Sequence, residues 1–168
     1  ASGSIRSKVM GMTRTGLVLV ASTRASRGEY SDRSGPILVD FLRSVGVDTP
    51  DARVVADADI DEAFRRALAE DPSVLLTSGG TGVTPDDRTV DVVAPHLDRE
   101  LPGIVHAFYN RGLASVPTAV LSRAVAGVAG STFVMTLPGS TGGARDGAAV
   151  LGPILTHLLD QLEGHHEH

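Results

Sequence analysis

Residues 74–89, VLLTSGGTGVTPDDRT, constrain the fold of this chain more than any other stretch of its sequence. The stretch begins with consecutive apolar residues, which is the pattern of a strand covered on both faces of a sheet. Gly79, Gly80 and Gly82 follow at once, and a backbone without Cβ atoms can adopt positive φ and approach a ligand closely. The stretch therefore predicts a buried strand that leads into a loop able to direct several N–H groups at an anion such as phosphate.

Two carboxylates, Asp86 and Asp87, lie within reach of the same loop, which also contains Thr81. Carboxylates repel phosphate unless a divalent cation lies between them, so we expect Mg²⁺, which binds through one or two carboxylates and substrate phosphates. Open α/β sheets place their ligands at this end of their strands. The alternative is a tight connection in which Asp86 or Asp87 caps a helix. A Walker A loop and the dinucleotide fingerprint are excluded, because no Lys follows the glycines and the GxGxxG spacing is absent.

A second glycine-rich turn, PGSTGG at 138–143, follows a buried apolar run at 132–137. A strand, a glycine turn and a helix N-terminus in succession predict a second anion site, because free N–H groups and the helix dipole favour a phosphate there. Ser140 directly follows Gly139, so the turn is not a G-x-S-x-G nucleophile elbow.

Apolar runs at 16–21 and 53–56 predict two more strands, and apolar residues at helical spacing predict helices over 37–45, 60–68 and 151–162. Strands that alternate with helices indicate an α/β fold: a three-layer sandwich with a mostly parallel central sheet and right-handed crossovers. Both glycine loops then follow strands and can meet along one edge of the sheet.

Weaker signals predict the connections between these elements. Asp59 and Glu62, three residues apart, predict a capping box at the start of the second helix. Asp32 can likewise cap the first helix. A turn is expected at the Pro-Gly pair of 102–103. Residues 117–128 mix small and apolar types, so strand and helix remain equally open there.

A chain of 168 residues is expected to form one domain with its own core. We expect a disordered extension at 1–14, the domain at 15–163 and a flexible tail at 164–168. No apolar run approaches the roughly 20 residues of a membrane span, and no signal-peptide block is present, so we expect a soluble, cytoplasmic protein that binds no membrane. The absence of Cys excludes disulfides and thiolate zinc sites, and the formal net charge of −5 argues against nucleic-acid binding.

Three motifs in order resemble the molybdopterin adenylyltransferase family, whose molybdopterin-binding fold is also one domain of gephyrin: STRASRGEYSDRSGP, GGTGVTPDDRT and LSRAVAGVAGSTFVMTLPGS. The resemblance covers residues 15–162. It implies that the terminal phosphate of molybdopterin attacks the α-phosphate of ATP, which gives adenylyl-molybdopterin and pyrophosphate in the presence of Mg²⁺. It also implies a homotrimer, and the molybdenum-inserting protein of the pathway as a further partner.

By the same resemblance, Asp57 and Asp87 are the catalytic residues and the Mg²⁺ ligands. The resemblance assigns substrate and phosphate contacts to residues of four short segments: Ser22, Gly79, Gly80, Thr81, Gly82, Ser122, Arg123, Pro138, Gly139 and Ser140. From the residues alone, Asp57 is equally well a helix cap and Arg123 equally well a structural ion-pair partner. The chain departs from the family at Thr23, where an acid is usual, and at Thr141, where proline is common.

Two other functions fit the same loops. A non-catalytic molybdopterin carrier would keep both glycine turns but need no metal-binding acids, so the presence of Asp57 together with Asp87 tells against it. A nucleotide pyrophosphatase on the same fold would need an activated water instead, and analysis of its products would separate it from a transferase.

Overall fold

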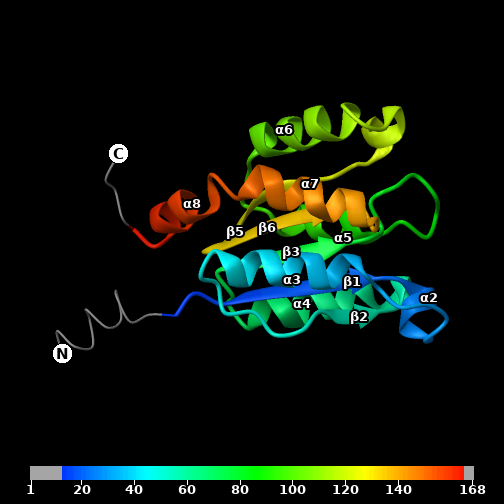
Figure 1. The fold of residues 1–168 in the computed structure, drawn as a ribbon. Helices are drawn as coiled ribbons and strands as arrows, with labels where there is room; N and C mark the ends of the chain where they lie inside the picture. Colours follow the sequence, from blue (N-terminus) through cyan, green and yellow to red (C-terminus); the bar gives the residue numbers. More distant parts are fainter. Residues whose placement is uncertain (1–12, 165–168) are drawn as a thin grey trace.

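The computed structural model describes residues 13–164 and contains one six-stranded sheet with the strand order β2-β1-β3-β6-β5-β4 (Figure 1). The strands are β1 (Gly16–Ala21), β2 (Arg53–Val55), β3 (Val74–Ser78), β4 (Arg99–Glu100), β5 (Ala126–Ala129) and β6 (Thr132–Leu137). β1, β2, β3 and β6 pair in parallel, whereas β5 and β4 add an antiparallel edge beyond β6. The mostly parallel sheet predicted from the apolar runs is confirmed.

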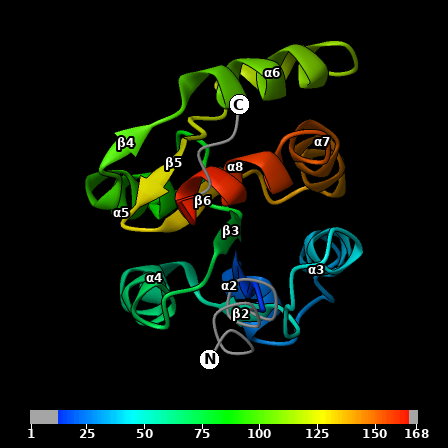
Figure 2. The ribbon, with the colours of Figure 1, turned by 90° about the vertical axis from the view of Figure 1, so that its left-hand side faces the viewer.

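Helices cover both faces of the sheet, which gives the predicted three layers (Figures 1 and 2). The α-helices are α2 (Thr23–Ser26), α3 (Ser34–Ser44), α4 (Ile60–Ala69), α5 (Thr89–Val93), α6 (Pro102–Leu113), α7 (Thr141–Leu151) and α8 (Leu155–Leu162). Three 3₁₀ turns connect them: η1 (Asp57–Asp59), η2 (Ala94–His96) and η3 (Pro117–Leu121). α3, α6, α7 and α8 pack on one face, and α4 and α5 pack on the other.

The core divides in two because successive side chains of a strand point to opposite faces. In β1, Val18 and Val20 face the α3 and α7 side, whereas Leu17 and Leu19 face α4. All six residues of β1 are buried, as expected for a parallel strand with helices on both sides. This arrangement holds the carboxyl ends of β1, β3 and β6 in line, since Val20 pairs with Ser78 and Ser78 with Leu137.

Three local predictions are wrong. Asp59 makes no capping hydrogen bond, because the chain enters α4 through the 3₁₀ turn η1 and Asp59 has compact rather than extended backbone angles. Pro102 does not make a separate turn but begins α6, where its fixed φ suits the first helical position and its missing N–H is not needed. The apolar stripe at 151–162 belongs to two helices, because Pro153, which has no N–H to donate, lies between α7 and α8.

The folded domain includes Arg14, which the sequence placed in the extension. Its guanidinium donates to Asp160 in α8 and to Glu163 just after α8. Its carbonyl accepts from the N–H of Asp48. The hydrogen bond to Glu163 is the main reason that the pKa of Arg14 is raised. Residues 1–12 of the predicted extension and 165–168 of the predicted tail lie outside the described residues. Among residues 13–164, no helix is both long and apolar enough to cross a membrane.

Candidate functional site

A cavity of about 840 Å³ opens at the carboxyl ends of β1 and β3, next to the turn that follows β6. It brings together five of the residues predicted from the sequence: Ser22, Asp57, Gly80, Asp87 and Gly139. These residues come from four separate segments of the chain, and the parallel register of the strands places them side by side. The predicted meeting of the two glycine loops and Asp57 at one edge of the sheet is therefore present.

The loop after β3 needs its glycines for conformation and for space. Gly79 and Gly80 have φ of +97° and +74°, which L side chains rarely adopt. A Cβ on Gly79 would lie 2.3 Å from the carbonyl oxygen of Ala21. The N–H of Gly79 donates to the carbonyl oxygen of Leu137 at 2.9 Å, so this loop is hydrogen-bonded to the end of β6. Gly82 and Thr81 lie further along the loop and do not line the cavity.

Arg123 holds the same loop from outside the cavity. Its Nε donates to the carbonyl of Gly82 at 2.8 Å, and Nη2 donates to the carbonyl of Asp87 at 2.9 Å. Its Nη1 donates to Asp91 at 3.1 Å, and this hydrogen bond raises the pKa of Arg123 and lowers the pKa of the Asp91 carboxyl. The guanidinium thus has protein partners at all three nitrogens, which is the structural role that the sequence left open.

Asp87 uses one carboxylate oxygen inside its own loop. Oδ2 accepts from the N–H and the hydroxyl of Thr84, at 3.0 and 2.7 Å. Oδ1 has no hydrogen-bond partner among residues 13–164, and Asp87 lines the cavity. Neither Asp86 nor Asp87 caps the next helix, since α5 starts after Arg88 without a side-chain cap.

Asp57 is arranged in the same way. Its Oδ2 accepts from the Thr23 hydroxyl at 2.9 Å, and its own N–H donates back to that hydroxyl oxygen at 3.0 Å. Its Oδ1 makes no hydrogen bond in the described part of the chain. Thr23, the position of the usual family acid, is therefore a neutral partner that orients Asp57 without adding a second negative charge. The capping role considered for Asp57 is not seen, because its side chain bonds only to Thr23.

The two aspartates fit a Mg²⁺ ion that also contacts phosphate. Each has one oxygen fixed by the protein and one available in a shared cavity. Within residues 13–164, no three His, Asp or Glu side chains gather as a metal-binding group. Mg²⁺ usually takes one or two carboxylates and completes its shell with water and substrate phosphates, so this donor set is chemically suitable.

A second cavity, of about 320 Å³, lies between α6, η3 and the start of α7. Phe108, Val116 and Ala119 give it apolar walls, and Ser122, Pro138 and Ser140 of the predicted set also line it. At the start of α7, Ser140 Oγ caps the helix by accepting from the N–H of Gly143 at 3.0 Å. The turn at 138–140 therefore separates the two cavities: Gly139 borders the first, and its two neighbours border the second.

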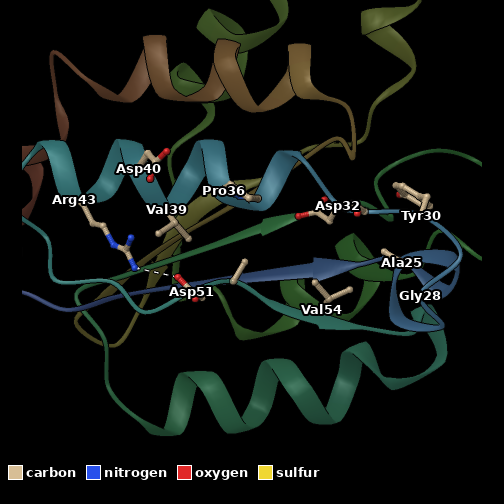
Figure 3. Close-up of a pocket in the computed structure, with 12 residues that line it drawn as sticks. Ala25, Gly28, Tyr30, Asp32, Pro36, Val39, Asp40, Arg43, Asp51 and Val54 are labelled. Carbon is tan, nitrogen blue, oxygen red and sulfur yellow. Dashed lines mark hydrogen bonds and ion pairs between the residues drawn. The ribbon is translucent and has the colours of Figure 1, made fainter.

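A third cavity of about 590 Å³ runs between α3 and the edge strand β2 (Figure 3). It shares Tyr30 and Asp32 with the first cavity, which we call the acidic cavity because Asp57, Asp86 and Asp87 also line it. Asp32 lies one residue before the cap position of α3 and accepts from the N–H groups of Ser34 and Gly35 at 3.2 and 2.8 Å, so it stabilises the helix entry as predicted. The Tyr30 hydroxyl lies 3.1 Å from Ser22 Oγ, and Arg24 stacks 5.2 Å from its ring. Sequence reasoning did not single out Tyr30, although an aromatic residue in a polar loop was the available signal.

These features define an α/β domain with a cavity at the carboxyl ends of its parallel strands, where open α/β sheets place their ligands, and this cavity is lined by residues of two glycine turns and by Asp57 and Asp87. The family model for a "Probable molybdopterin binding domain" matches residues 17–157. The chain therefore belongs to this family of molybdenum cofactor biosynthesis proteins, which confirms the resemblance carried by the three motifs.

Individual relatives agree with this assignment. The chain is 36% identical over 149 residues to a molybdenum cofactor biosynthesis bifunctional protein of Chlorobaculum tepidum, with 88% of this chain and 48% of that protein covered. It is 34% identical over 155 residues to gephyrin of Dictyostelium discoideum, with 84% and 21% covered. The chain thus spans about half or less of these curated relatives. The solved structure of the molybdopterin biosynthesis Mog protein of Mycobacterium ulcerans superposes with a TM-score of 0.83 at 43% identity, covering 89% of this chain and 99% of that one.

Proposed function

We propose that this protein adenylates molybdopterin: a phosphate oxygen of the pterin bonds to the α-phosphorus of ATP, the α–β anhydride bond breaks, and pyrophosphate leaves. The observation that carries the proposal is the turn at 138–140, which borders an acidic cavity through Gly139 and a more apolar cavity through Pro138 and Ser140. A nucleotide bound in the acidic cavity and a pterin bound in the more apolar cavity would lie on opposite sides of the 138–140 turn. Such an arrangement supplies proximity and orientation for joining two phosphorylated molecules.

The chain's own groups would hold the ligands in register. The N–H groups of Thr141 and Gly142 at the start of α7 have no protein partner in the described residues, so they can donate to a phosphate there. Arg123 fixes the loop at 80–87 through two carbonyls and so sets where Asp87 lies. Asp57 and Asp87 would bind Mg²⁺ through their available oxygens. Bound Mg²⁺ would neutralise the charge that develops on the transferring phosphoryl group.

Asparagine variants test the acid pair cleanly. In Asp57→Asn and Asp87→Asn the amide oxygen can still accept from Thr23 or Thr84, and only the available oxygen is replaced by an uncharged NH₂ group. We expect turnover to fall at least about a hundredfold, roughly 3 kcal/mol of transition-state stabilisation, while thermal unfolding is little changed. Asp86 lines the same cavity but lies one position off the family motif, so Asp86→Asn is the matched control and should stay active.

The assay is incubation with ATP, Mg²⁺ and molybdopterin, followed by identification of adenylyl-molybdopterin and pyrophosphate. Equal turnover by wild type and Asp87→Asn would refute the metal-binding role. Pterin binding without any acid-dependent product would indicate a carrier. Formation of AMP and pyrophosphate without the adenylated pterin would indicate a pyrophosphatase.

A further inference from the structure

Two buried serines connect the start of α3 to the turn between the two cavities. Ser34 and Ser78 are 2% and 0% exposed, and their Oγ atoms lie 2.7 Å apart. Ser34 Oγ also lies 2.8 Å from Asp32 Oδ1, and Ser78 Oγ lies 3.2 Å from the carbonyl oxygen of Pro138. These four groups form a continuous chain of three oxygen–oxygen contacts. It runs from Asp32, seen beside the first turn of α3 in Figure 3, to the beginning of the 138–140 turn.

The three contacts have only two hydroxyl protons between them, so they cannot all be hydrogen bonds at the same time. Each hydroxyl donates one proton, and the Pro138 carbonyl and an ionised Asp32 carboxylate only accept, so two protons serve three contacts. The Asp32 carboxylate draws the Ser34 proton, because hydrogen bonds to a charged acceptor are the stronger ones. The proton of Ser78 then has two competing acceptors, the oxygen of Ser34 and the carbonyl of Pro138.

We infer that Ser78 is a positioning residue with two hydrogen-bonded states. In one state its hydroxyl holds the Pro138 carbonyl, and in the other it turns to Ser34 and releases the turn. The turn packs directly on the adjacent loop, since a Cβ on Gly139 would lie 3.4 Å from the Cα of Gly79. Its catalytic consequence rests on the proposed function, because the position of the turn would decide how closely the ligands of the two cavities approach each other.

The neighbouring residue offers a matched control. Thr77 is as buried as Ser78 and lies on the same strand, but its Oγ1 has no hydrogen-bond partner in the described residues. Thr77→Val keeps the size of the side chain and removes a hydroxyl that takes no part in the network. Any effect of Ser78→Ala that Thr77→Val does not share is therefore due to the network and not to the loss of a buried hydroxyl in general.

The Pro138 carbonyl reports the state directly, since a carbonyl carbon resonates further downfield when its oxygen accepts a hydrogen bond. We expect its ¹³C resonance in the full ligand-free chain to move upfield in Ser78→Ala and downfield in Ser34→Ala, because Ser78 then has a single acceptor left. Thr77→Val should leave it in place. Shifts in the same direction for both serine variants, or no shift in Ser78→Ala, would overturn the inference. A simple packing role for the serines predicts shifts in the same direction.

Turnover tests the catalytic consequence separately. We expect Ser78→Ala to lower kcat for adenylation about tenfold with little change in the KM for ATP, because the relative placement of the ligands changes while their binding groups remain. Wild-type kcat in Ser78→Ala would refute the positioning role. If the wild-type protein forms no adenylated pterin, the proposed function fails, and the opposite carbonyl shifts still decide whether the two-state hydroxyl exists.

Discussion

Alanine substitution at three glycines separates backbone strain, steric clash and ligand approach. Gly28 and Gly80 have nearly the same φ, +75° and +74°. A Cβ on Gly28 would meet nothing within 4 Å, whereas one on Gly80 would lie 2.1 Å from Thr89 Oγ1 and 2.9 Å from Thr89 Cβ. Gly139 does not have positive φ, and the nearest atom to its added Cβ would be at 3.4 Å, an ordinary contact.

These geometries give three different magnitudes. A left-handed conformation costs an L residue about 1–2 kcal/mol, so Gly28→Ala should lower the free energy of unfolding by that amount. Gly80→Ala adds a steric cost of about 1–3 kcal/mol. Thr89 cannot easily retreat, because its N–H donates to the Gly80 carbonyl at 3.1 Å. Gly139→Ala should stay within about 0.5 kcal/mol of wild type.

Thermal unfolding followed by circular dichroism measures the series. Each kcal/mol corresponds to roughly 2–4 °C in a domain of this size, so Tm should fall in the order Gly139→Ala, Gly28→Ala, Gly80→Ala, with a loss of roughly 5–20 °C for the last. Titration calorimetry with ATP and Mg²⁺ should show weaker binding to the stable Gly139→Ala variant, because the added methyl group borders the acidic cavity. If Gly80→Ala is no less stable than Gly28→Ala, the steric argument is wrong. Unchanged ATP affinity in Gly139→Ala would show that the turn is only a connection.

Three further predictions concern stability and assembly. Arg14→Met should cost about 1–2 kcal/mol in urea unfolding, because Arg14 binds two carboxylates and its side chain is mostly shielded from solvent. Arg66→Met, which breaks only a pair with Glu62 between two largely exposed side chains, should cost almost nothing. The Arg53 hydrogen bond lowers the pKa of Glu70, so Glu70→Gln should lose no more than about 1 kcal/mol at pH 7. That difference should vanish as the pH falls through the lowered pKa, where the wild-type carboxyl also becomes neutral. We propose a homotrimer whose contacts include the exposed apolar residues of η3, so Val120→Asp should yield monomers in light scattering at micromolar concentration, and a monomeric wild type would refute it.

The buried parts of the sheet could be predicted from the sequence because helices cover both of its faces. All residues of β3 and β6 are buried, and the three consecutive apolar residues within each, 74–76 and 133–135, identified the strand. The antiparallel edge gave no such signal. β4 has two exposed charged residues, and β5 consists of Ala, Gly and Val, so its conformation depends on pairing with β6 and not on local preference.

The candidate site was predicted in part for a similar reason. Glycines and acids directly after strands, such as Gly80 and Asp87, can be read from order along the chain. The role of Arg123 could not be predicted, because the sequence does not show whether its guanidinium donates to a bound phosphate or to protein groups. In the structure it donates to two loop carbonyls and to Asp91 of α5. The contact between Ser34 and Ser78 joins residues 44 positions apart, and no local pattern encodes it.

The ion pairs of Arg14 have a consequence for how this domain can be joined to others. Through them the side chain of Arg14, two residues before β1, contacts Glu163, just after α8. Figure 1 shows the start of β1 and the end of α8 on the same side of the domain. The chain therefore enters and leaves the domain at neighbouring points, at the amino end of β1. The cavity lined by Asp57 and Asp87 and the cavity between α6 and α7 instead open around turns that follow the carboxyl ends of strands. Because these two ends lie close together, the domain could be inserted into a surface loop of another protein with little rearrangement of that loop. Domains fused at these two ends would therefore join the fold at the edge of the sheet opposite the loops that line the acidic cavity.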